Sequence, residues 1–497
     1  APRFEHRLFL SATPHNGHSN SFSALLEILD PQRFCRGVPV NTKMLEAVMV
    51  RRLKEDVRKI GYAFPHREVV QLDIDGLPAD APELRLSALL DQYRRMREER
   101  LKGETKRKQA AAGLLITGLQ QRLLSSIEAF ARTLRVHRRT VQRQWDEARA
   151  EAAAQPASKA PRPALLPGLA EVLAAETTAG DRFLVGGPSD SSASQSSVSR
   201  SARLDLLPGA VGADDDRATL SEDQLQAEED AQFEAVSAAT VGPLTDAEDK
   251  IRFAREKKLL DEMTEIAEAA RSLPDARVRR LIKWIRENMC PNLPEPGKPR
   301  SSAPAEWNDI RVIFFTEYDD TKTYLNQQLS PLIEGTDRGP ERIAIYHGPT
   351  PPAQRKEIQR AFQADPAKHP VRILIATDAA REGLNLQAHC WNLFHFDVPW
   401  NPSRMEQRNG RIDRKLQEAD TVYCHYFVYQ QRPEDRILRV LVRKTETIRE
   451  ELGSLSEVID ARLADALKLG IRRDRIDALE RDIESADLDP ETRSTVD

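Results

Sequence analysis

The sequence predicts an α/β protein whose main part is a parallel sheet with helices on both faces, and two observations lead to this prediction. The first is a series of short apolar runs of strand length, at 311–315 (RVIFF), 343–346 (IAIY), 371–377 (VRILIAT), 391–396 (WNLFHF) and 422–429 (VYCHYFVY). The second is the helical periodicity of the segments between them, near 319–330, 352–363 and 402–409. Short apolar strands that alternate with helices indicate a parallel sheet covered on both faces.

Length and composition limit the class of protein. The chain has 497 residues, 74 Lys and Arg against 78 Asp and Glu, and a formal net charge of −4. This length allows roughly two to four domains, and the balanced charge requires any nucleic-acid site to be a local basic surface. We expect no membrane span, because no run of about 18 apolar residues occurs. The four cysteines lie far apart without a CxxC pair, so we expect no metal site and a reducing, cytoplasmic location.

The segments before the predicted sheet are varied. Residues 7–14 are expected to form a strand that ends in a Ser/Thr-Pro turn, two helices are expected to follow, and 67–74 alternate like a strand. Residues 76–149 are helical and basic. One apolar stripe there predicts the core of a helical bundle: Ile116, Leu119, Leu123, Ile127, Phe130 and Leu134. The basic residues of its first half could contact phosphates or form a solvated face: Arg94, Arg95, Arg97, Arg100, Lys102, Lys106, Arg107 and Lys108.

The composition changes again after residue 149. Residues 150–250 are rich in Ala, Pro, Ser and then acidic residues, with few large apolar side chains. We expect this low-complexity linker to be largely disordered, because it buries too little surface to offset the entropy of ordering. A helix is possible near 245–270, and residues 431–497 predict a charged helical tail.

The motif most informative about chemistry is Gln407-Arg408-Asn409-Gly410-Arg411-Ile412-Asp413-Arg414. Arg411 and Arg414 are three positions apart and would project from one face of a helical turn. Two convergent guanidiniums suit a phosphoryl group and can stabilise the charge that develops on it during transfer. Gly410 would allow a close approach of the backbone. The alternative is a solvated basic helix with Arg–Asp pairs.

Several motifs in a fixed order resemble the SNF2 branch of the superfamily 2 helicase-like ATPases. They are Ser11-Ala12-Thr13-Pro14 (motif III), 314–318 (motif IV), 346–348 with Arg355, 376–386 (motif V), and 397–402 with 407–414 (motif VI). The EGxNxQ and FD-P-x-NP variants are similar to bacterial RapA/HepA-like proteins and to SNF2-like helicases of phage-defence operons such as DISARM. The resemblance covers about 1–75 and 275–430.

The resemblance implies a motor with two RecA-like lobes that bind ATP and Mg²⁺ between them. Lobe 2, the helicase C-terminal lobe, would supply Arg411 and Arg414 as arginine fingers, with Gln407 coupling the nucleotide state to lobe closure. The same resemblance places Gly383, Asn385 and Gly410 near the nucleotide. It directs Thr316 and Thr377 to the nucleic-acid backbone, and it makes Ser11, Ala12 and Thr13 a relay between the two sites.

Two family motifs are missing from this sequence. It has no GxxxxGK[ST] phosphate-binding loop, and its Asp-Glu pairs, Asp146-Glu147 and Asp261-Glu262, sit in polar helical segments. Both motifs belong upstream of Ser11, and the chain begins at Ala1-Pro2 without an initiator Met. We therefore expect a C-terminal fragment that is inactive alone, with ATP and Mg²⁺ held mainly by the upstream part.

The resemblance implies an organisation of five parts. These are the end of lobe 1 (1–75), a basic helical insertion (76–149), the linker (150–250), lobe 2 (275–430) and the tail (431–497). The implied function is ATP-dependent translocation on double-stranded DNA, with RNA polymerase or a phage-defence complex as possible partners. Two alternatives stay open: a non-catalytic module that binds DNA or RNA polymerase, and a strand-separating helicase.

Overall fold

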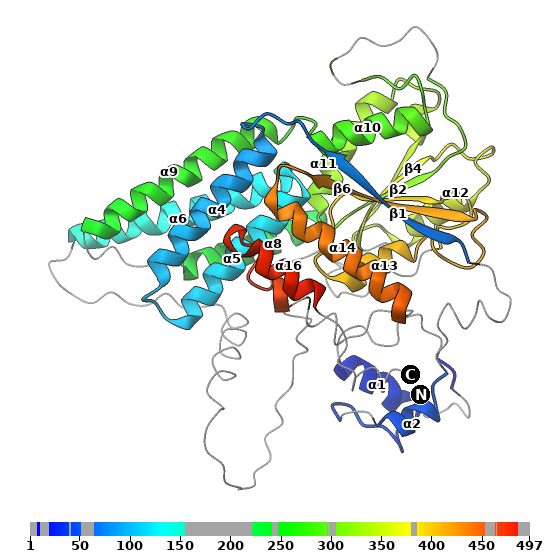
Figure 1. The fold of residues 1–497 in the computed structure, drawn as a ribbon, viewed down its shortest axis with the longest axis horizontal. Coiled ribbons are helices and arrows are strands. Elements are labelled where there is room, and N and C mark those ends of the chain that lie inside the picture. The colour runs from blue at the N-terminus through cyan, green and yellow to red at the C-terminus, as the bar shows by residue number, and fades with distance from the viewer. Residues whose placement is uncertain are drawn as a thin grey trace.

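The residues that the structure describes form one six-stranded sheet whose strands are all parallel (Figure 1). We analysed it in a computed structural model that describes residues 7–9, 19–38, 41–50, 64–154, 221–240, 247–295, 297, 305–378, 385–452, 463 and 465–485. The strand order is β1-β6-β5-β2-β4-β3. The strands are β1 (His66–Ile74), β2 (Val312–Thr316), β3 (Ile343–Tyr346), β4 (Ile373–Thr377), β5 (Asn392–His395) and β6 (Thr421–Tyr429). This arrangement confirms the predicted fold class.

Helices cover both faces of the sheet because the strand residues alternate between two apolar cores. Val312 and Phe314 of β2 belong to one core, together with helices α10 (Ala276–Asn288) and α11 (Asp319–Ile333). Ile313 and Phe315 point into the other core, which α12 (Pro352–Gln363) closes. Helices α13 (Pro402–Asn409), α14 (Pro433–Leu452) and α16 (Ile476–Glu484) pack against the side of the sheet formed by β6 and the edge strand β1. The period of two residues in a strand thus places large side chains on both faces.

Strand β1 corrects the expected boundary at residue 75. It was expected at the end of lobe 1, but it pairs with β6 along its whole length, from His66 opposite Thr421 to Ile74 opposite Tyr429. Residues 66–74 therefore belong to the same sheet as residues 312–429. The strand itself was predictable from its alternation, whereas its partner lies more than 350 residues further along the chain. In the sequence, the helical insertion therefore lies between β1 and the other five strands of this sheet.

The described part of the insertion is a bundle of five helices beside the sheet (Figure 1). They are α4 (Pro82–Leu101), α5 (Lys106–Ser125), α6 (Ile127–Ala154), α8 (Glu222–Ala239) and α9 (Ala247–Ala270). All six residues of the predicted apolar stripe are buried in its core, which confirms that prediction. The Asp-Glu pairs at 146–147 and 261–262 lie in α6 and α9, as their polar surroundings indicated.

Helix α8 corrects the expectation for part of the linker. The acidic segment at 222–239 is an ordered helix, which begins with a capping box between Ser221 and Gln224. Phe233 and Val236 are each only 2% exposed, in the core of the bundle. Two apolar side chains one turn apart suffice here because the other helices supply the rest of the core. The helix expected near 245–270 is α9, and residues 155–220 lie outside the described part of the chain.

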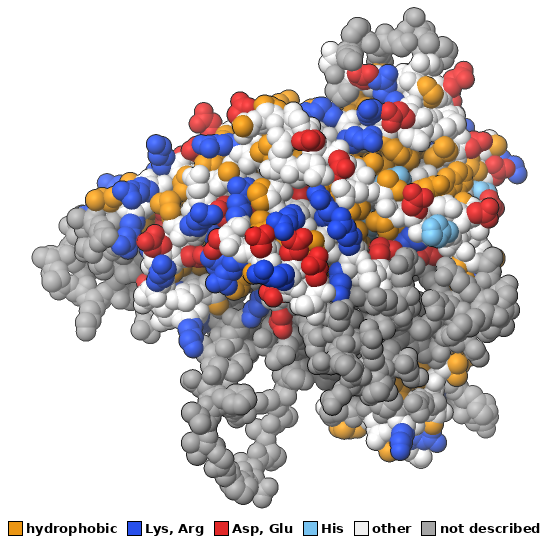
Figure 2. Space-filling view, in the orientation of Figure 1, with side chains coloured by type: hydrophobic (Ala, Val, Ile, Leu, Met, Phe, Trp, Pro, Cys, Tyr) orange, Lys and Arg blue, Asp and Glu red, His pale blue; other side chains and the backbone are white. Residues whose placement is uncertain are grey.

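The basic first half of the insertion is partly internal, which corrects its interpretation as a phosphate-binding or solvated face. Arg94 and Arg97 are buried. Arg94 donates to the carbonyl of Ile471 at 3.0 Å, and Arg97 pairs with Glu256 at 3.3 Å. Figure 2 shows basic and acidic side chains interspersed over the visible face of the bundle, so this face carries no patch of one sign.

A buried arginine joins the bundle to the sheet. Arg277, at the start of α10, donates to the carbonyls of Leu124 at 2.7 Å and Ser125 at 2.5 Å in the bundle. It also donates to the carbonyl of Phe396 at 3.2 Å, directly after β5. One guanidinium thus donates hydrogen bonds to backbone carbonyls of the bundle and of the sheet. Buried carbonyl groups need such partners.

The remaining described elements are short. Helices α1 (Ser19–Leu29) and α2 (Thr42–Glu46) lie where two helices were expected near the N-terminus, and residues 7–9 are not in a strand. The tail contains α14, the 3-10 turn η5 (Arg473–Arg475) and α16, and a second such turn, η3 (Gly339–Glu341), precedes β3. Among the described helices, none has both the length and the apolar character needed to cross a membrane.

Candidate functional site

Three carboxylates stand at the carboxyl edge of the sheet, where parallel α/β sheets bind their ligands. Glu317 directly follows β2, Asp378 directly follows β4, and Asp397 lies two residues after the end of β5. Asp378 and Asp397 are buried, and the Glu317 side chain is 13% exposed. Since β2 is hydrogen-bonded to both β4 and β5, the three acids lie on neighbouring strands of one edge.

Helix α13 lies across this edge and pairs with the acids. Asn401 caps it by accepting from the amides of Ser403 and Arg404, and Pro402 occupies the first turn. Arg404 and Arg408 are four residues apart and share one face. Arg404 pairs with Glu317 at 2.6 Å, and the Arg408 Nε pairs with Asp378 Oδ1 at 2.6 Å. The helix is therefore held to the strand ends by charge-assisted hydrogen bonds.

Asp397 is the centre of the hydrogen-bond network. Its carboxylate accepts from the hydroxyls of Thr316 and Ser125, each at 2.5 Å, and from the amide of Glu317 at 2.9 Å. Arg408 donates to its carbonyl oxygen at 2.9 Å. The network corrects the expectation that Thr316 faces nucleic acid. Thr316 is fully buried, and its hydroxyl positions Asp397.

The predicted arginines lie in the turn that follows α13. Helix α13 ends at Asn409, and the backbone continues in helical turns through Asp413. Arg411 donates from Nε to the carbonyl of Gln407 at 3.2 Å, and Arg414 donates from Nη1 to Oδ1 of Asn385. Gln407, Arg411 and Arg414 are all partly exposed, whereas Arg408 is completely buried. The structure therefore pairs Arg411 with the backbone of Gln407 and Arg414 with the side chain of Asn385.

Of the other predicted residues, two are described by the structure and four are not. Gly410 continues this turn in the right-handed helical region, with φ −62° and ψ −3°. Thr377 is buried at the end of β4 and lines a cavity of about 370 Å³. Gly383 and Ser11, Ala12 and Thr13 lie outside the described residues.

The cavity lies between the sheet edge and the helical bundle, and several of the charged residues that line it form ion pairs. Arg132 of α6 binds both Asp320 and Asp230, each at 2.9 Å. Burial raises the pKa of the Asp320 carboxyl, whereas Arg132 acts in the opposite direction. Among the described residues, no group of three or more His, Cys, Asp or Glu side chains could hold a metal ion.

Glu317 makes the stability of this edge dependent on pH. Burial raises the pKa of its carboxyl to about 7; Arg404 opposes the shift, and Asp378 adds to it. A carboxyl whose pKa is higher in the folded state stabilises the fold while protonated, so this contribution is lost as pH rises from about 4.5 to 7. We expect Glu317→Gln to gain roughly 1–3 kcal/mol relative to the wild type over this interval. Unfolding temperatures at pH 5, 6, 7 and 8 test this, and a difference that is constant with pH would contradict it.

Sequence reasoning gave no individual role to five partly or fully buried members of the site, of which only Arg404 lies outside the motifs named above: Glu317, Asp378, Asp397, Arg404 and Arg408. One signal for the acids was available, because each follows an apolar strand closely. The i, i+4 spacing of Arg404 and Arg408 was a second signal. Arg67, described below, gave no local signal, because its partners are more than 300 residues away.

Comparison with known proteins agrees with this architecture. Residues 306–415, which contain β2 to β5 and the turn after α13, match the Helicase conserved C-terminal domain. The fold and this match define a RecA-like helicase C-terminal domain. The chain is similar to the Uncharacterized ATP-dependent helicase YqhH of Bacillus subtilis (strain 168), with 34% identity over 151 residues, or 30% of this chain and 25% of that protein. The matched part of the chain is therefore similar to the C-terminal domain of helicases.

Two further likenesses are more limited. Defense against restriction protein B of Escherichia phage P1 is 28% identical over 134 residues, which are 26% of this chain and 6% of that protein. The crystal structure of the C-terminal part of the Fun30 ATPase domain gives a TM-score of 0.27 at 15% identity, over 46% of this chain and 65% of that chain. The match to the B. subtilis protein thus spans a quarter of that relative's length, and the match to the phage protein far less.

Proposed function

We propose that this chain is the second-lobe part of an ATP-dependent, SNF2-like translocase that moves along double-stranded DNA. The observation that carries the proposal is the turn after α13, where Arg411 donates to the backbone of Gln407 and Arg414 donates to the side chain of Asn385. A motor of this type needs guanidiniums that reach a transferred phosphoryl group from a second lobe.

The fit of these residues to a phosphoryl group rests on their donors and exposure. Arg411 and Arg414 each keep part of their side chain accessible, and a guanidinium has five N–H donors in a planar fork that matches phosphate oxygens. Mg²⁺ would be held with ATP by an upstream lobe, where it would neutralise charge on the phosphates. The role of this chain is to orient the two arginines, and closure of the lobes would bring them to the site. The partners remain those that the sequence suggests, RNA polymerase or a phage-defence complex.

The test is ATP hydrolysis by two proteins in parallel, with and without linear duplex DNA. We expect chain 1–497 alone to show no turnover, and the full-length polypeptide, with an upstream phosphate-binding loop, to hydrolyse ATP faster when duplex DNA is present. Displacement of a triplex-forming strand would distinguish translocation from duplex separation. Turnover by chain 1–497 alone would overturn the two-lobe assignment. DNA binding by a full-length protein that never hydrolyses ATP would favour the non-catalytic binding module.

A further inference from the structure

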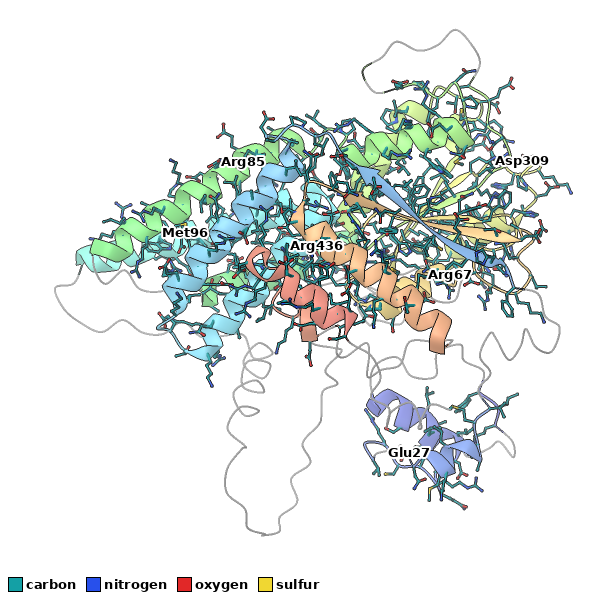
Figure 3. All side chains as sticks on the ribbon, in the orientation of Figure 1. Glu27, Arg67, Arg85, Met96, Asp309 and Arg436 are labelled. Atoms are coloured by element: carbon teal, nitrogen blue, oxygen red, sulfur yellow. The ribbon has the colours of Figure 1, made fainter. Side chains whose placement is uncertain are left out.

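Among the described residues, Arg67 near the start of β1 has one of the largest sets of side-chain hydrogen bonds and ion pairs. Figure 3 labels it beside α14, at the edge of the sheet. Its side chain is 1% exposed, and it forms ion pairs with Glu406, Asp413 and Glu446. Nε and Nη2 donate to Asp413 Oδ2 at 2.9 and 2.6 Å. The η nitrogens also donate to both oxygens of Glu406, at 2.5 and 3.2 Å, and to Glu446 at 3.0 Å.

These contacts account for all five N–H donors of the guanidinium. Burial lowers the pKa of Arg67, but the three carboxylates outweigh it and hold the pKa well above its usual value. The side chain therefore stays charged, and its orientation is fixed by partners on two helices and a turn. One carboxylate would be enough to balance the charge of Arg67, whereas three carboxylates surround it.

Two of the three partners of Arg67 lie at the two ends of the arginine turn, and the third, Glu446, lies in α14. Glu406 directly precedes Gln407, and Asp413 directly precedes Arg414. On the inner side of the same turn, Arg408 is bound by Asp378 and Asp397. The backbone that carries Arg411 and Arg414 is thus held from the sheet by Arg408 and from the edge strand by Arg67.

We propose that Arg67 is a positioning residue, whose guanidinium fixes both ends of the turn from Gln407 to Arg414 and thereby places Arg411 and Arg414 for phosphoryl transfer. This inference rests on the proposed function. Buried ion pairs contribute little net stability compared with apolar replacements. A cluster of this kind at the base of a catalytic turn is better explained by the precision it gives the turn, since small displacements of reacting groups are costly in rate.

The chain offers a matched control in Arg97. It is also 1% exposed and pairs with a buried glutamate, Glu256, but it lies within the helical bundle. In the full-length protein we expect Arg67→Met to lower kcat for ATP hydrolysis roughly 100-fold with little change in KM for ATP. Arg97→Met should leave kcat near the wild-type value at a temperature where both variants are folded. Equal kcat values for the two variants would overturn the inference.

A second measurement does not depend on ATP. In chain 1–497, Arg67→Met should speed amide hydrogen exchange at residues 410–414, and Arg97→Met should not. If Arg67→Met does not fold, Glu406→Gln removes one partner and leaves Asp413 and Glu446 in place. It should lower kcat, and an unchanged kcat would count against the inference. Arg414→Ala separates the two proposals: if that variant keeps its ATPase, the proposed function fails whatever Arg67 does.

Discussion

Replacing Arg414 with alanine is expected to abolish ATP hydrolysis by the full-length protein while leaving its affinity for duplex DNA almost unchanged. Arg414 is partly exposed, and its Nη1 donates a hydrogen bond to Oδ1 of Asn385, which is itself exposed. An arginine supplied to a transferred phosphoryl group contributes at least about 1000-fold to kcat. Its loss should therefore appear in kcat, measured by phosphate release at saturating ATP and DNA.

The matched control for this variant is Arg436→Ala. Arg436 is an exposed arginine of α14, labelled in Figure 3, that pairs with Asp477 at 2.8 Å on the surface. Exposed pairs of this kind contribute little, so the control should keep its ATPase and its fold. DNA affinity is measured by fluorescence anisotropy at a fixed salt concentration, because phosphate contacts are salt-dependent. If Arg414→Ala loses ATPase and DNA affinity together, Arg414 is a DNA-contact or structural residue and not an arginine finger.

The sheet could be predicted from the sequence because its central strands are apolar on both faces. The side chains of residues 312–316 alternate between two apolar cores. Such an apolar run can be recognised in the sequence without knowing which segments pack against it. The position of β1 could not be predicted in the same way, because its register is set by β6. Helix α8 was not predicted for a related reason. Its two buried apolar residues, Phe233 and Val236, cannot form a core by themselves, and the other residues of that core come from the other helices of the bundle.

The site shows the same limit at the level of single side chains. In the sequence, Arg408, Arg411 and Arg414 are three arginines of one motif, and their spacing suggested only that Arg411 and Arg414 share a face. The structure separates them by burial, which depends on Asp378 and Asp397 at the ends of two distant strands. Thr316 was misjudged for the same reason, because its acceptor, Asp397, lies 81 residues further along the chain.

The buried arginine of the motif should have the largest effect on stability. Arg408 is completely buried, and its pairs with Asp378 and Asp397 raise the pKa of its guanidinium against the effect of burial. Arg408→Met would leave two buried carboxylates without their cation. Breaking a buried pair in this way costs about 3–5 kcal/mol, so we expect a large fall in the unfolding temperature of chain 1–497.

The double variant Arg408→Met with Asp378→Asn provides the control, since it also neutralises one of the two carboxylates that lose their arginine partner. It should recover part of the loss, because the cost comes mainly from the unpaired carboxylates and not from the missing arginine. Thermal unfolding of the wild type, both single variants and the double variant gives the coupling energy. Additive losses would show that Arg408 does not interact with Asp378 in the folded protein. A coupling of roughly 1–3 kcal/mol would show that Arg408 and Asp378 interact in the folded protein and that this pair holds α13 to the end of β4.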